Sequence, residues 1–136
     1  MLRSVAAVLA GFISMTVLVM VGTLALVALL VPGGLQRMKE MRSSGAQSIP
    51  EPSAGYLAAN VVMSFVIAVI GGLVTQRIAT HAPMAHLLAL CGVMLLMGFI
   101  SSRMPGSAAQ PSWYRVAIPF VSVAGVLASA LVTGAP

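Results

Sequence analysis

The chain alternates between four long apolar segments and shorter polar ones. The apolar segments predict helices over about residues 4–31, 54–76, 83–100 and 115–133. Each is long enough for a helix to cross the hydrocarbon core of a bilayer, which is about 30 Å thick and takes roughly 20 residues. Strands of a membrane barrel would instead alternate polar and apolar residues. The pattern therefore predicts an all-α fold, an integral membrane four-helix transmembrane bundle in which residues 1–136 form a single domain.

The first apolar segment is expected to remain as an uncleaved helix. It runs without a charge from Ser4 to Val31, which exceeds the apolar region of about 7–15 residues in a signal peptide. It ends at Pro32, followed by Gly33 and Gly34, because proline lacks a backbone donor and glycine has a low helical preference.

The polar connections differ in length. Residues 32–53 form the one substantial loop, in which Leu35, Met38 and Met41 recur at three-residue spacing. That spacing suits either a short amphipathic helix at the membrane surface or a flexible loop. Only residues 77–82 separate the second and third helices, so these two must form an antiparallel hairpin.

The composition and the flanking residues are those of a membrane protein. The chain is 60% hydrophobic and 7% charged, whereas a soluble domain carries about 25% charged residues, so soluble enzymes are excluded. Its net charge of +5 comes from single basic residues at segment ends, and not from the basic stripe with exposed aromatics that binds nucleic acid. Trp113 and Tyr114 are expected to anchor the fourth helix at the membrane surface. We therefore expect a multi-pass protein that contacts membrane lipid and has no nucleic-acid partner.

The distribution of basic residues predicts an orientation. Five of them fall on one side of the membrane and two on the other: Arg37, Lys39, Arg42, Arg103 and Arg115 against Arg3 and Arg77. Because basic residues are enriched in cytoplasmic loops, this count predicts that both termini lie outside.

Parts of the last three helices resemble a known kind of protein. Ala68–Ala79 (AVIGGLVTQRIA), His86–Phe99 and the sequence Gln110-Pro111-Ser112-Trp113 resemble a loosely defined group of uncharacterised small bacterial four-helix membrane proteins. The resemblance implies this architecture and a location in the bacterial inner (plasma) membrane, but no activity. It also implies cytoplasmic termini, opposite to the charge count, so both orientations stay open.

Groups that carry chemistry are scarce. None of the four apolar segments has an acidic or basic residue in its interior, which excludes proton-coupled pumps that need an ionisable group at membrane depth. The chain has no Asp, and its two carboxylates, Glu40 and Glu51, lie in the first loop. Neither a Ser-His-Asp set nor a pair of carboxylates held at one site is available. The sequence predicts no enzyme and no catalytic residue.

The candidate ligands for a metal or cofactor are two histidines, one cysteine and ten methionines. His81 and His86 are five residues apart, about 140° around a regular helix, so they cannot chelate one metal. The sequence Ala82-x-x-x-His86 resembles the pigment-ligating histidine of single-helix antenna polypeptides, but an interfacial histidine is the preferred interpretation. Cys91 and the methionine pairs are interpreted as packing residues. We expect no metal and no cofactor.

Small and polar residues form the clearest pattern. In the second helix they recur at every fourth position, at Asn60, Ser64, Ala68, Gly72 and Gln76, and the fourth helix has a shorter version that includes Gly125 and Ser129. Small residues let helix backbones approach closely in a membrane. These helix-packing residues either close the bundle internally, which we prefer, or leave a surface free for another protein.

Three functions follow from these patterns. The first is a non-enzymatic accessory or assembly subunit of a larger membrane complex, whose partners are other membrane subunits or further copies of itself. The alternative is a homo-oligomeric channel or transporter for a small neutral solute, with Asn60, Ser64 and Gln76 along its path. The third is a cofactor- or pigment-binding protein that uses His86. A pore needs the stripe to face a wet lumen, whereas a subunit needs it packed.

Overall fold

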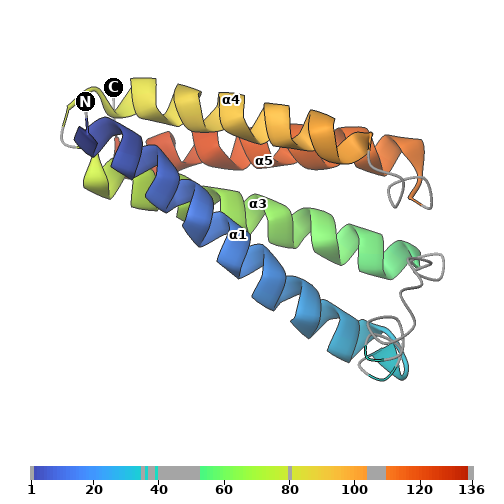
Figure 1. Cartoon of the computed structure of the whole chain (residues 1–136). Helices are drawn as coiled ribbons and strands as arrows, with labels where there is room; N and C mark the ends of the chain where they lie inside the picture. The colour runs from blue at the N-terminus through green and yellow to red at the C-terminus, as the bar shows by residue number, and fades with distance from the viewer. Residues whose placement is uncertain are drawn as a thin grey trace.

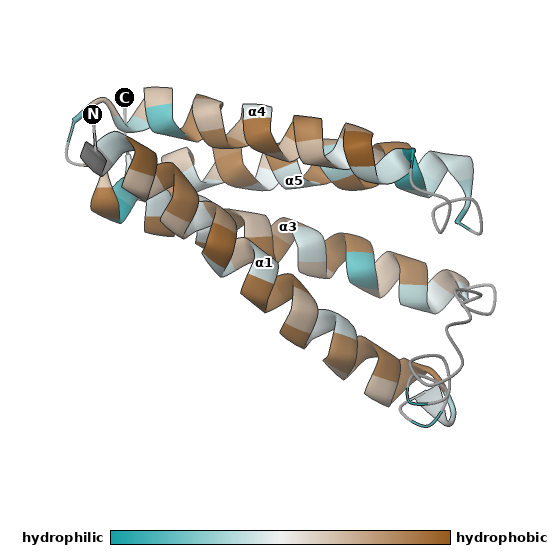
Figure 2. Ribbon diagram, in the orientation of Figure 1, coloured by the Kyte–Doolittle hydropathy of each residue, from teal (hydrophilic) through white to brown (hydrophobic). Residues whose placement is uncertain are grey.

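The chain forms four long helices over the residues that the structure, a computed structural model, describes: 2–34, 36, 39, 53–79, 81–103 and 110–134. They are α1 (Leu2–Leu30), α3 (Ala54–Ile78), α4 (Pro83–Ser102) and α5 (Ser112–Thr133) (Figure 1). Each is long and apolar enough to cross a membrane, and Figure 2 shows hydrophobic residues along the whole length of all four helices. The expected all-α fold with four such helices is confirmed.

Two helix boundaries differ from the expected ones, at the arginines Arg77 and Arg115, which were expected to mark the ends of the helices. The second helix continues beyond residue 76 through Arg77 to Ile78, and stops where Ala79 is extended. An arginine ends an apolar run, but it is a good helix former. The fourth helix starts at Ser112, earlier than residue 115, because the Pro111 carbonyl already accepts helical hydrogen bonds.

The other two helices also differ slightly in length from the prediction. α1 starts two residues earlier than expected and ends one residue earlier, and α4 extends two residues further. Beyond α1, Gly33 has a φ of +68°, a conformation that favours glycine, and the Gly34 N–H donates to the Val31 carbonyl over 2.9 Å. Leu35, Met38 and Met41, for which either a short amphipathic helix or a flexible loop was open, lie outside the described residues.

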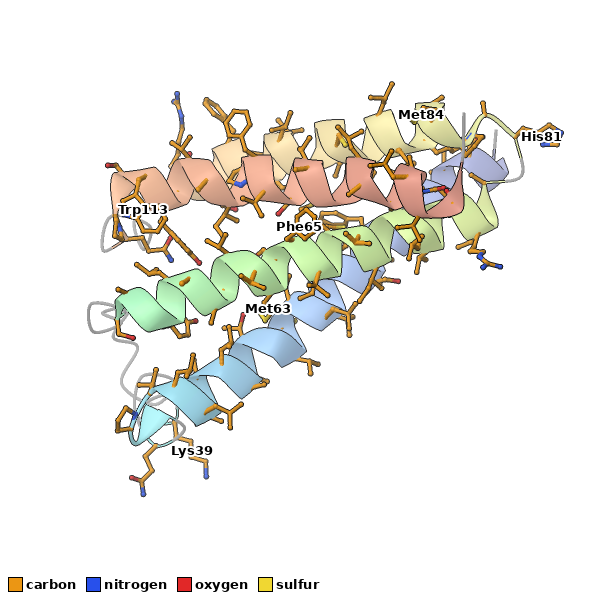
Figure 3. All side chains as sticks on the ribbon, turned by 180° about the vertical axis from the view of Figure 1, so that it is seen from behind. Lys39, Met63, Phe65, His81, Met84 and Trp113 are labelled. Atoms are coloured by element: carbon orange, nitrogen blue, oxygen red, sulfur yellow. The ribbon has the colours of Figure 1, made fainter. Side chains whose placement is uncertain are left out.

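α3 lies at the centre of the bundle, between α1 and α5, and α4 packs mainly on α5. The helices converge at one end, where α3 passes into α4, and α1 diverges from the others toward the opposite end (Figure 1). We call these the narrow end and the wide end. Trp113 and Lys39 lie at the wide end and His81 at the narrow end (Figure 3).

The core combines large and small apolar side chains. Its buried members come from all four helices: Met15, Ile67, Ala68, Leu87, Leu90, Cys91, Val126 and Ala130. Within α1, only Ala7, Gly11 and Met15 are buried among the described side chains, and these share one narrow face. The partly buried Val8, Phe12 and Leu18 add contacts with the core beside this face, and α3 is packed on two sides, by α1 and by α5.

Candidate functional site

One close contact between helices is the seam, as we call it, between α3 and α5, formed by Ala68, Gly72, Gln76, Gly125 and Ser129. A Cβ built on Gly72 would lie 2.8 Å from Ser129 Cβ and 3.0 Å from the Val126 carbonyl oxygen. A Cβ built on Gly125 would lie 2.6 Å from the Phe65 carbonyl oxygen and 2.8 Å from Ala68 Cβ. The two backbones therefore touch at the glycines, and no larger residue fits there.

Hydrogen bonds between side chains fasten the seam at its two ends. At the narrow end Gln76 Nε2 donates to Ser129 Oγ over 2.7 Å, and Thr133 Oγ1 donates to Gln76 Oε1. Toward the wide end, Asn60 Nδ2 donates to Tyr114 Oη. Asn60 and Gln76, two polar members of the predicted stripe, thus find partners within the chain.

The structure places the seven predicted helix-packing residues in two neighbouring regions. Five of them form the seam itself, and Asn60 reaches across it to Tyr114. Ser64 is 9% exposed and lines a groove beside the seam. The stripe on α3 therefore faces mainly α5, a helix of the same chain.

A second close contact lies between α1 and α3, where Gly11 meets Gly71 and Thr75. A Cβ built on Gly11 would lie 2.9 Å from the Gly71 carbonyl oxygen, and Thr75 packs against the same glycine. Adjacent helical residues point about 100° apart, so Gly71 faces α1 while Gly72 faces α5. In the sequence, the Gly71-Gly72 pair indicates this arrangement, because two adjacent glycines allow two different helices to approach α3 closely.

An open groove of about 450 Å³ lies between α1 and the other three helices. Its lining changes character along its length. Toward the wide end it includes Asn60, Tyr114 and Arg115, and toward the bundle centre it includes Met15 and Ile67. The divergence of α1 seen in Figure 1 leaves this groove between the helices.

The aromatic pair at the start of α5 is divided between the surface and the interior. Trp113 is 57% exposed, as expected for an anchor, but Tyr114 is only 5% exposed and is bonded to Asn60. The two rings meet edge to face, with centroids 5.7 Å apart. The prediction that both residues anchor the helix is wrong for Tyr114, because neighbouring helical residues point in different directions.

Arg115 supplies a positive charge at the mouth of the groove. It is half-buried and also lines a second cavity of about 520 Å³ between α4 and α5. No aspartate or glutamate occurs among the described residues. Arg103, at the same end, instead has its guanidinium carbon 4.5 Å from the centre of the Phe99 ring.

The histidines, the cysteine and the methionines considered as candidate ligands form no evident centre within the described residues, which hold no group of three His, Cys, Asp or Glu side chains placed to bind a metal. His81 is exposed, and Cys91 is buried in the core. Met94 and Met97 both line the groove, whereas Met38 and Met41 lie outside the described residues.

His86 is fixed by its own helix. Its Nδ1–H donates to the Ala82 carbonyl oxygen over 2.9 Å, and this bond orients the ring. We expect the purified protein to be colourless, because His86 belongs to no group of three His, Cys, Asp or Glu side chains among the described residues. The absorption spectrum of the protein from native membranes tests this. A stoichiometric band that His86→Ala removes, and that His81→Ala leaves intact, would show the expectation to be wrong.

Comparison of the chain with protein-family models, curated proteins and solved structures gives no match.

Proposed function

We propose that this chain is a multi-pass protein of the bacterial inner membrane and a non-enzymatic accessory or assembly subunit of a larger membrane complex. Four helices of suitable length and hydropathy support the membrane location. The absence of carboxylates and of metal-binding clusters among the described residues supports a role without catalysis.

The observation that carries the subunit role is a small-residue face on α4 with no neighbour in the described part of the chain. Ala85, Ala89 and Gly92 share one helix face, and all three are exposed. A Cβ built on Gly92 would meet no atom within 4 Å. In a membrane such a face lets a second helix approach closely. Unlike the seam residues of α3 and α5, this face is available to another protein.

The channel alternative receives less support. Two of the three polar side chains assigned to its path bond within the chain, Asn60 to Tyr114 and Gln76 to Ser129 and Thr133. A side chain that already makes hydrogen bonds within the chain has fewer donors and acceptors left to replace the water around a passing solute. The subunit role does not require these groups to be free.

Purification of the tagged protein from native membranes tests the subunit role. We expect a stoichiometric partner with the wild type, and at least a tenfold loss of that partner with Gly92→Leu, because leucine prevents close approach. The thermal stability of the chain should not fall, because Gly92 faces open space and leucine is a better helix former.

The matched control is Gly55→Leu, since a Cβ at this helical glycine also meets nothing within 4 Å. It should retain the partner. Equal partner loss in both variants would refute the α4 face as the contact. A lone homo-oligomer with no other protein would contradict the subunit role and favour the channel alternative.

A further inference from the structure

We propose that the groove between α1 and the other helices binds one anionic phospholipid, with the headgroup phosphate at Arg115 and an acyl chain along α1. This inference rests on the membrane-spanning part of the proposed function and is independent of the subunit role. It assigns a ligand class to the groove.

The order of polar and apolar residues along the groove matches that of a lipid. Arg115 lies in the first turn of α5, and Gln110 lies just before this helix. Both are at the wide end, where a headgroup would lie. Toward the middle of the helices the lining is mainly apolar, with Phe12, Ile67 and Met94, and it also includes serine and threonine side chains. An acyl chain needs such a surface, and a phosphate needs charged and polar donors.

Charge complementarity favours an anionic headgroup. Among the described residues no carboxylate is present to pair with Arg115, which is half-buried beside the groove. A partly desolvated guanidinium gains by binding a phosphate, often through two parallel hydrogen bonds. Lys39 and Arg103 lie at the same end of the molecule and add to its positive potential.

The size of the groove favours a lipid over a protein helix. Its volume of about 450 Å³ falls within the range of about 300–1,000 Å³ that small-molecule sites occupy. A helix about 10 Å across and about 30 Å long fills on the order of 2,000 Å³. A partner helix would therefore fit only if α1 moved away, whereas an acyl chain enters the groove as it stands.

Native mass spectrometry of the intact chain in non-ionic detergent tests the site. Phosphatidylglycerol and phosphatidylcholine with identical acyl chains are added separately, and the lipid retained per chain is measured. We expect one phosphatidylglycerol per wild-type chain and weaker retention of phosphatidylcholine. Arg115→Gln should weaken phosphatidylglycerol retention about tenfold, which corresponds to about 1.4 kcal/mol. Arg103→Gln, which removes a charge beside Phe99 at the same end, should retain it.

A second pair of variants tests the acyl-chain part without altering charge. Thr16 is exposed and lines the groove, and its neighbour Val17 is exposed and does not. Thr16→Trp should block retention of either lipid, and Val17→Trp should not. Equal retention of the two lipids, or equal effects within either pair of variants, would overturn the site. Retention of lipid by Thr16→Trp together with loss of a co-purifying protein would assign the groove to a partner helix instead.

Failure of the lipid site is distinguishable from failure of the proposed function. Release of the wild-type chain from membranes by alkaline carbonate would overturn the membrane-spanning proposal and the lipid site with it. If Gly92→Leu loses its partner but retains phosphatidylglycerol, the two contacts are separate, as proposed. If the chain resists extraction and retains no lipid, only the lipid site is overturned.

Discussion

Replacing Gly72 with leucine is expected to lower the free energy of unfolding in detergent by about 1–3 kcal/mol, as overpacking does in close-packed interiors. The new side chain would start 2.8 Å from Ser129 Cβ and 3.0 Å from the Val126 carbonyl oxygen. A carbonyl in the middle of a helix cannot move aside, so α3 and α5 must separate. Because lipid and detergent tails are already apolar, the added leucine gains little by burial. Thermal or denaturant unfolding in micelles measures the loss.

The matched control is Val62→Leu on the same helix. Val62 is 64% exposed, so the larger side chain has room outside the seam. We expect its unfolding midpoint to stay close to that of the wild type. If Gly72→Leu and Val62→Leu change stability equally, the contact between α3 and α5 does not hold this bundle together.

Replacing Gly11 with leucine is expected to detach α1 while the seam between α3 and α5 persists. The side chain would start 2.9 Å from the Gly71 carbonyl oxygen and displace Thr75. We expect a loss of about 1–3 kcal/mol by the same overpacking mechanism. Few other described side chains of α1 are buried, so the loss should appear as local opening of this helix.

Hydrogen exchange followed helix by helix distinguishes local opening from global unfolding. In Gly11→Leu, exchange should rise in α1 and stay slow in α3 and α5. In Gly72→Leu, exchange should rise in α3 and α5 together. Ile13→Leu is the control for α1, because Ile13 is 58% exposed. Uniform acceleration in Gly11→Leu would contradict a separately held α1.

Which surface each small residue serves was decided only by the tertiary structure. The recurrence of small and polar residues at every fourth position of α3 predicts a surface for helix packing. The pattern alone allows the packing helix to belong either to this chain or to another protein. Neighbouring positions such as Gly71 and Gly72 meet different helices, and Trp113 and Tyr114 meet different environments. Facing depends on how the helices cross, and the crossing is set by contacts between residues far apart in the chain.

The existence of four long helices was determined by the sequence alone. Apolar runs of this length, broken by Pro32 and by the short polar connections, leave few alternatives, because a buried backbone in lipid must satisfy its hydrogen bonds within each helix. The groove could not be read from the same pattern. It exists because α1 diverges from the other helices toward the wide end, which leaves Arg115, Tyr114 and Asn60 in the lining of an open groove. Helix length follows from local composition, whereas the space between helices follows from their packing.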